Sequence, residues 1–339
     1  MGTFNGKSDY HYQTCRCNCD LLKVVQLGIS VFNEDGESPP AAVLAADLGL
    51  DMRRLETRKF AGTMVHVPTT WQFNFNFSFQ EDMFSEVSIE SMRQAGIDFQ
   101  RLETEGIDPV QFGALLVSSG MVCEEDVKWI SFHGGYDFGY LTKLLLRMPL
   151  PETEDEFDVY MRKFFPKFYD VKCLIKAATR QQQTNQSTPL DASAAEVLMK
   201  FEAKPQLETL VDALKIKRTG PAHQAGSDSL MVGKAFFRVQ DRIFNGSVPV
   251  EFEGKVWGIG ASDAQNNQNT QSTPQHYNQQ LQENVAPGQN GYATPSTPNN
   301  ANAGLAHNTP AHSSNGGTGG PLTPGGAGGA FGSFQYSGR

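Results

Sequence analysis

The composition of the chain changes sharply after Gly260, and this boundary limits which part of the sequence can build a folded core. From Ala261 to Arg339 the only formally charged side chains are Asp263, Glu283 and Arg339, while Asn, Gln, Gly, Pro, Ser and Thr dominate. Such a segment has too little apolar surface to offset the entropy of ordering its chain. We therefore expect one folded domain over residues 1–260 and a disordered Asn/Gln/Gly/Pro-rich tail over residues 261–339.

Charge and composition exclude several classes of protein. No run of about 18 apolar residues occurs, so we expect neither a membrane span nor a membrane partner. The polar stretch Met1–Asp20 lacks the apolar centre of a secretory signal, and five cysteines form no disulfide framework. We therefore expect a reduced protein of the nucleus and cytoplasm. A net charge of −9 argues against non-specific phosphate binding over a wide surface, unless bound metal ions supply positive charge.

The first half of the domain reads as a hairpin with a long interruption. Leu21–Phe32 is rich in strand-forming residues and ends in a turn at Asn33–Gly36. In Thr70–Phe79 aromatic and polar residues alternate, which predicts a partner strand with one buried face; base stacking on these rings is the weaker alternative. We interpret residues 41–68 between them as an insertion, with a short helix near residues 45–57.

The second half alternates between strand and helix patterns, which predicts an α/β fold with a mixed sheet flanked by helices. Strand-like runs lie at Val127–His133 and Phe168–Ile175, and a short edge element lies at Glu253–Gly258. A polar loop is expected at Arg180–Pro189. The helices are predicted at Ser85–Ala95, Val110–Ser119, Gly135–Leu146, Leu207–Ile216 and Ser227–Phe244.

Two features near these elements have competing interpretations. Cys15, Cys17 and Cys19 alternate, and on a strand they would share one face, where they act either as small buried residues or, less favourably, as a zinc site. Asp170 could contact a metal-bound water, but a hydrogen bond to nearby backbone is the simpler expectation.

Two local groups of residues carry possible chemistry. In SFHGGYDFGYL an apolar strand ends in small residues, and Asp137 begins a helix at the strand's carboxyl edge, where a carboxylate can reach a metal ion. In HQAGSDS, His223 precedes a helix that Asp228 enters, so a carboxylate could hold a metal while the imidazole contacts its water. In both cases helix capping is the alternative interpretation.

Several longer strings in the same order resemble one known family. SFHGGYDFGYL, FYDVKCLIK, GPAHQAGSDSLMVGKAFF and TTWQFNFNFSFQEDMFSEVSIE are similar to segments of the Caf/Pop-type deadenylase, the ribonuclease-H-like nuclease subunit of the CCR–NOT complex. The resemblance covers most of the chain to about residue 260. The exceptions are the insertions at residues 41–68 and about 180–204.

The resemblance implies a 3′–5′ exoribonuclease of the DEDD class, histidine subtype, that shortens poly(A) tails of messenger RNA. In that class acidic residues hold two divalent metal ions, magnesium or manganese, for in-line hydrolysis. Asp137 and Asp228 match metal-binding carboxylates, and His223 matches the general base. The implied partners are poly(A) RNA, the scaffold subunit of the CCR–NOT complex and a second deadenylase subunit.

One family motif has no counterpart here. The resemblance implies an Asp-x-Glu pair on a central strand, but the only such triplet, Asp35-Gly36-Glu37, lies in the predicted turn, and we reject it as a substitute. Two acidic ligands and a central strand are then missing, and we expect the chain as written to be inactive or nearly so. A truncated gene model is the favoured explanation. The alternatives are a non-catalytic bridging module of the same complex and a nuclease for DNA or structured RNA.

Overall fold

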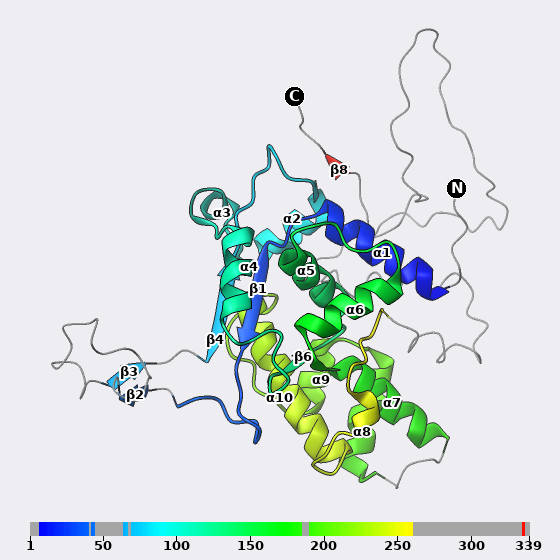
Figure 1. Ribbon diagram of the computed structural model, residues 1–339. Coiled ribbons are helices and arrows are strands. Elements are labelled where there is room, and N and C mark those ends of the chain that lie inside the picture. The colour runs from blue at the N-terminus through cyan, green and yellow to red at the C-terminus, as the bar shows by residue number, and fades with distance from the viewer. Residues whose placement is uncertain are drawn as a thin grey trace, which may run out of the picture.

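Helices build most of the domain in the computed structural model, which describes residues 7–40, 42–44, 64–66, 69–184, 190–259 and 334–335 (Figure 1). Among these ranges no helix is long and apolar enough to cross a membrane. The helices are α1 (Lys7–Leu21), α2 (Glu86–Gln94), α3 (Phe99–Glu105), α4 (Pro109–Ser118), α5 (Gly135–Leu146), α6 (Glu154–Phe164), α7 (Val171–Gln183), α8 (Ala192–Ala203), α9 (Leu207–Ala213), α10 (Ala225–Ile243) and the 3-10 turn η3 (Val250–Phe252).

The strands are short and form four separate pairs. They are β1 (Gln26–Ser30), β2 (Ala42–Leu44), β3 (Met64–His66), β4 (Thr70–Asn74), β5 (Phe84–Ser85), β6 (Lys128–Ser131), β7 (Lys167–Asp170) and β8 (Phe334–Gln335). β1 pairs with β4, β2 with β3 and β5 with β8, all antiparallel, whereas β6 and β7 are parallel. Within the described ranges, β1 and β6 therefore each have a strand partner on one edge only.

The predicted hairpin between β1 and β4 is confirmed, in a register that pairs Gln26 with Asn74 and Ser30 with Thr70. The aromatic alternation after β4 turns inward as expected: Phe75 and Phe77 are almost fully buried. The Phe75 ring meets the ring of Phe112 on α4 edge-on, with the centroids 5.1 Å apart. These rings are thus part of the core, and the core interpretation of the alternation is confirmed over base stacking.

The interruption between β1 and β4 contains the small hairpin β2–β3. The short helix predicted near residues 45–57 lies outside the described residues. The disordered tail predicted for residues 261–339 also lies outside them, except for Phe334–Gln335, which pairs as β8 with the edge of β5.

The prediction that Cys15, Cys17 and Cys19 lie on a strand is wrong, because α1 contains all three. On a helix, residues four positions apart share a face, so Cys15 and Cys19 are both buried and Cys17 is exposed. The two buried sulfur atoms lie 3.9 Å apart against the glycines of α5. The strand signal of Leu21–Phe32 is correspondingly limited to β1.

The prediction of a strand over Phe168–Ile175 is wrong in its second half. β7 ends at Asp170, and α7 begins at Val171 with Asp170 as its N-cap. Val171, Leu174 and Ile175 are fully buried at helical spacing. Part of the polar loop expected at Arg180–Pro189 is also helical, since α7 continues to Gln183.

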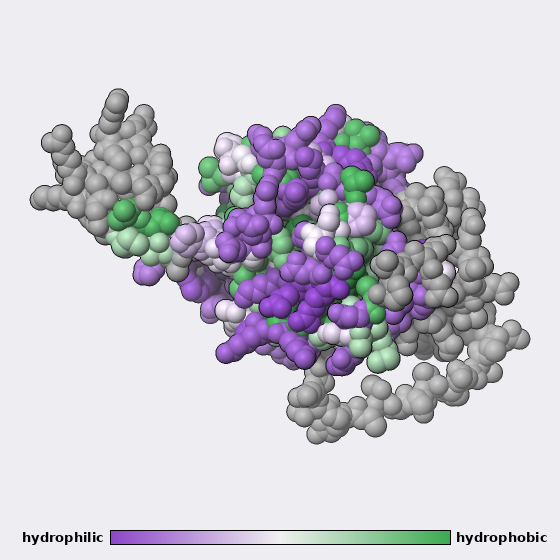
Figure 2. All heavy atoms as spheres, turned by 90° about the horizontal axis from the view of Figure 1, so that it is seen from below, coloured by the Kyte–Doolittle hydropathy of each residue, from purple (hydrophilic) through white to green (hydrophobic). Residues whose placement is uncertain are grey.

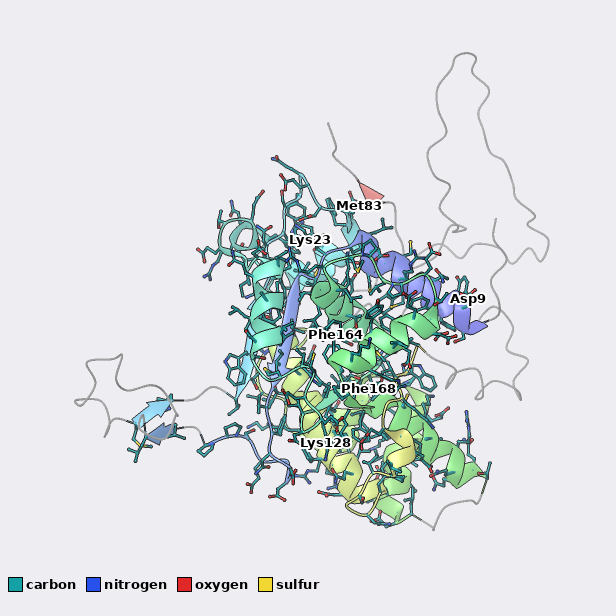
Figure 3. All side chains as sticks on the ribbon, in the orientation of Figure 1. Asp9, Lys23, Met83, Lys128, Phe164 and Phe168 are labelled. Atoms are coloured by element: carbon teal, nitrogen blue, oxygen red, sulfur yellow. The ribbon has the colours of Figure 1, made fainter. Side chains whose placement is uncertain are left out.

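Two further features place the core (Figures 1 and 3). α8 lies in residues assigned to an insertion, yet its Val197, Leu198 and Phe201 are buried against α7 and α9. Phe168 of β7 is fully buried and lies in the interior in Figure 3. The face seen in Figure 2 is mostly hydrophilic, with hydrophobic residues in small separate groups.

The carboxylate of Asp170 joins three parts of the fold. It is fully buried and accepts hydrogen bonds from four backbone amides. Two of these amides, those of His133 and Gly134, follow β6, at 3.0 and 2.8 Å. The other two belong to Lys172 at the start of α7, at 2.9 Å, and to Trp257 near the end of the domain, at 3.0 Å. One side chain thus fixes the carboxyl ends of both parallel strands.

Replacing Asp170 by Asn tests this role. The amide keeps one acceptor oxygen but places an N–H group among backbone donors, so two buried donors lose their partner. We expect a loss of about 2–4 kcal/mol in the free energy of unfolding. Asp108 is the matched control, because it also caps a helix by accepting from two amides, yet at the surface. Asp108→Asn should cost less than about 0.5 kcal/mol. Equal losses in urea denaturation would contradict the proposed role.

Candidate functional site

Asp137 lies where β6 passes into α5. Ser131 ends β6, Gly134 is the N-cap of α5, and Asp137 is in the first helical turn with an exposed side chain. The interpretation of Asp137 as a capping residue finds limited support, because the N-cap position belongs to Gly134 and Asp137 is hydrogen-bonded to its own backbone. Its carboxylate therefore retains access to water at the carboxyl edge of β6.

A second carboxylate changes the electrostatics around Asp137. Desolvation by the surrounding protein and, second, the nearby charge of Asp170 together raise the pKa of Asp137 to about 6. Burial also raises the pKa of Asp170, while its four amide donors oppose that shift. Because the Asp137 side chain is exposed, water limits this desolvation. Asp170 has both oxygens engaged by amides and has no open coordination position.

The start of α10 is held by glutamines from other elements. Gln224 is the N-cap residue but makes no cap hydrogen bond to its own helix. Instead, the side-chain oxygen of Gln26 on β1 accepts from the Ala225 amide at 2.8 Å, and that of Gln72 on β4 accepts from the Gly226 amide at 3.0 Å. These two bonds satisfy amides that every helix leaves unpaired at its start.

Gln224 completes this arrangement. Its side-chain oxygen accepts from Gln72 at 2.6 Å and from Gln26 at 3.3 Å, and its side-chain nitrogen donates to the carbonyl of Ala95 after α2. A side chain at Gly28 would collide with the Ala225 carbonyl, so the close approach of β1 to α10 requires glycine there. The β1–β4 hairpin thus sets where α10 begins.

His223 precedes this helix start on an exposed turn. Its backbone is left-handed, with φ of 61°, and its side chain faces solvent. An exposed imidazole next to a fixed helix start is accessible to a substrate water, as a general base requires.

Asp228 is in the first turn of α10 and is already paired. Arg218, on the segment between α9 and α10, donates from Nη1 to Oδ1 of Asp228 at 2.7 Å. The same guanidinium donates to Glu208 of α9 at 3.1 Å and to the Ser227 hydroxyl at 3.1 Å. Arg218 thus forms a three-member charged cluster with Asp228 and Glu208.

The structure brings His223 and Asp228 to one helix start, whereas Asp137 lies at the start of a different helix. In the described ranges no hydrogen bond or ion pair links any two of these three side chains. Over the same ranges no group of three or more His, Cys, Asp or Glu residues could hold a metal ion. Asp170 is saturated and Asp228 carries a guanidinium, so the described donors do not fit a centre for two divalent ions. The roles assigned to Asp137, His223 and Asp228 stay predictions.

Two contributions to this region have no local sequence signal. The glutamine cap joins residues about 150 to 200 positions apart, so no spacing rule identifies it. Arg218 likewise lies in a polar segment with no motif. For Asp170 the predicted hydrogen bond to nearby backbone is confirmed, and the helical spacing of the apolar positions after it also indicates a helix N-cap.

Comparisons with known proteins agree with the fold and the strings around the site. Residues 110–236 match the CAF1 family ribonuclease. The chain is 35% identical to the poly(A) ribonuclease pop2 of Schizosaccharomyces pombe over 305 residues, 90% of this chain and 74% of that protein. It is 36% identical to CCR4-NOT transcription complex subunit 7 of Caenorhabditis elegans over 266 residues, 77% of this chain and 71% of that protein.

Solved structures give the same result. The Mg²⁺- and Mn²⁺-bound form of S. pombe Pop2p has a TM-score of 0.58 and 36% identity, covering 76% of this chain and 84% of that one. Yeast CAF1 co-crystallised with the NOT1 MIF4G domain has a TM-score of 0.55 and 28% identity, covering 76% and 83%. The fold is that of a ribonuclease-H-like α/β nuclease, as predicted. The chain belongs to the CAF1 ribonuclease family.

A half-buried histidine beside the buried Lys172 makes stability depend on pH. His133 follows β6 in a left-handed conformation, with φ of 60°, and its Nδ1 lies 3.5 Å from Nζ of the buried Lys172. Desolvation, followed by the positive charges of Lys172 and His11, lowers the pKa of His133 to about 3. A lowered pKa means that the folded protein favours the neutral imidazole. The associated stability is present above the unfolded pKa of about 6.5 and is lost as the pH falls towards about 3.

Replacing His133 by Asn should remove this pH dependence. Asn tolerates the left-handed backbone but does not titrate. We expect the free energy of unfolding of the unmodified protein to fall relative to H133N by about 1–2 kcal/mol between about pH 7 and about pH 4, with allowance for the partial exposure of His133. Urea denaturation at several pH values measures this difference. His223→Asn controls for the backbone conformation, since its φ is nearly the same. Parallel curves for H133N and the unmodified protein would contradict the expectation.

Proposed function

We propose that this chain acts on the poly(A) tails of messenger RNA as a 3′–5′ exoribonuclease subunit of a CCR4–NOT complex, in the nucleus and cytoplasm. Membership of the CAF1 ribonuclease family is the observation that carries the proposal. The position of Asp137 in the first turn of α5, and of His223 just before and Asp228 within the first turn of α10, supports the proposal. The proposed partners are poly(A) RNA, a NOT1-type scaffold and a second deadenylase.

The division of labour among these residues follows from their chemistry. His223 is exposed and can take a proton from the attacking water as a general base. Asp137 and Asp228 are carboxylates suited to divalent ions such as Mg²⁺ or Mn²⁺, which in this enzyme class neutralise the phosphate charge. Among the described residues no group of three or more His, Cys, Asp or Glu could hold a metal ion, and Asp228 is paired with Arg218. We therefore propose that the chain has little hydrolytic activity unless further acidic ligands join the site.

A second candidate function follows from the same charge pairing. A protein whose carboxylates are engaged by amides and by Arg218 can still fold and bind partners. The chain would then act as a non-catalytic bridge inside the complex. Activity measurements separate the two functions.

The decisive measurement uses 5′-labelled poly(A) with Mg²⁺ or Mn²⁺. We expect the chain alone to shorten the RNA slowly or not at all, because two carboxylates bind hard cations weakly. Joining an Asp-x-Glu strand to the amino end should restore stepwise shortening, and Asp228→Asn in that protein should abolish it. Asp108→Asn, at a distant helix cap, is the control and should leave the rate unchanged. Absence of shortening after the strand is added would favour the bridging function.

One helix offers a surface for the scaffold. α4 exposes Val110, Leu115 and Val117, with exposed fractions of 44%, 69% and 50%. Val110 and Val117 are seven positions apart, two helical turns, so they lie on one face. Its opposite face is buried through Phe112 and Leu116. Exposed apolar residues gathered on one helix suit a stable protein partner, and we propose that the scaffold binds there.

Val117→Glu tests this surface. A charge on an apolar contact should lower the affinity for a NOT1 MIF4G domain by about tenfold or more. Val159 on α6 is the matched control, because it is also a helical valine and is 51% exposed. Val159→Glu should leave the affinity within about twofold. Isothermal titration calorimetry measures both, and equal affinities for the two variants would rule out α4 as the contact.

A further inference from the structure

Arg218 is bonded to Asp228, the carboxylate that the proposed function assigns to a metal ion. Its guanidinium lies between α9 and α10, and its side chain is only 23% exposed. It donates to Asp228 on one side and to Glu208 on the other, at 2.7 and 3.1 Å. Asp228 is therefore already paired with a positive charge that belongs to the protein.

The geometry of this ion pair favours a specific rather than an incidental contact. Asp228 is 29% exposed, so water screens the pair less than it screens a surface pair. Arg218 also donates to the Ser227 hydroxyl, which in turn donates to the Thr219 carbonyl at 2.7 Å. These bonds hold the guanidinium between Glu208 of α9 and the first turn of α10, against Oδ1 of Asp228.

We propose that Arg218 is an internal competitor of divalent cations at Asp228. Binding of a cation at this carboxylate requires the guanidinium to give up Oδ1 or to tolerate a second positive charge a few ångströms away, and both are unfavourable. Removal of Arg218 should therefore strengthen cation binding. The inference rests on the proposed function, because family membership is what makes Asp228 a cation ligand.

The opposite role predicts the opposite sign. If Arg218 only oriented Asp228 for a metal ion, its removal would loosen the carboxylate and weaken cation binding. The sign of the change therefore distinguishes a competitor from a positioning residue.

The test measures Mn²⁺ binding to the full chain without RNA, from the electron paramagnetic resonance signal of free Mn²⁺. Arg218→Gln should lower the dissociation constant for Mn²⁺ by about tenfold, the strength of a charged hydrogen bond in such a site. Arg218→Lys keeps the positive charge but cannot donate to Asp228 and Glu208 from two separate nitrogens. Its dissociation constant for Mn²⁺ should be intermediate. Circular dichroism confirms that each variant is folded, and the lysine variant decides the sign if the glutamine variant does not fold.

A double-mutant cycle localises the effect. In an Asp228→Asn background, Arg218→Gln should no longer change Mn²⁺ affinity. Arg101→Gln removes a positive charge from an exposed pair with Glu105 and should change the affinity by less than about twofold. The inference is overturned if Arg218→Gln leaves Mn²⁺ affinity unchanged or weakens it. It is also overturned if the gain persists without Asp228. A supportive result in a chain that never shortens poly(A) would leave this inference standing while the nuclease proposal fails.

Discussion

The buried carboxylate of Asp170 is the constraint on which the arrangement of the candidate site depends. A buried charge is costly unless hydrogen bonds replace its water, and here four backbone amides do so. Two of those amides lead from β6 into α5, which places Asp137. A third begins α7, and the fourth holds the segment around Trp257 against the parallel strands. The position of Asp137 thus follows from a buried carboxylate that backbone amides hold in place.

The second helix of the site is positioned by a different kind of contact. The glutamine side chains of β1 and β4 supply the acceptors for the first amides of α10, so the hairpin and the helix form one unit. Neutral amides can do this without adding charge near Asp228. α10 contacts both β1 and β6. It therefore connects the β1–β4 pair with the β6–β7 pair, which do not hydrogen-bond to each other in the described part of the chain.

Local periodicity explains which parts of the fold the sequence predicts. The alternating rings after Trp71 and the Gly-Ser junction in the first turn of α10 are local signals, and both elements form, although β4 ends at Asn74 and α10 begins at Ala225. The alternating cysteines predicted a strand wrongly, because α1 buries Cys15 and Cys19, which are four positions apart. The polar residues between and around them obscure this helical spacing. The strand predicted over Phe168–Ile175 ends at Asp170, because the apolar positions that follow recur at helical spacing.

The candidate site shows the same limit more strongly. Motif strings locate Asp137, His223 and Asp228, but they say nothing about Arg218 or the glutamine cap, which reach these residues from distant elements. Position and charge are thus set separately: helix starts place the carboxylates, whereas long-range donors decide whether the carboxylates are available. The sequence strings at these helix starts resemble the family, so the position of the carboxylates agrees with family membership. Catalytic competence depends on their availability, because a carboxylate already neutralised by a guanidinium contributes little attraction to a metal ion.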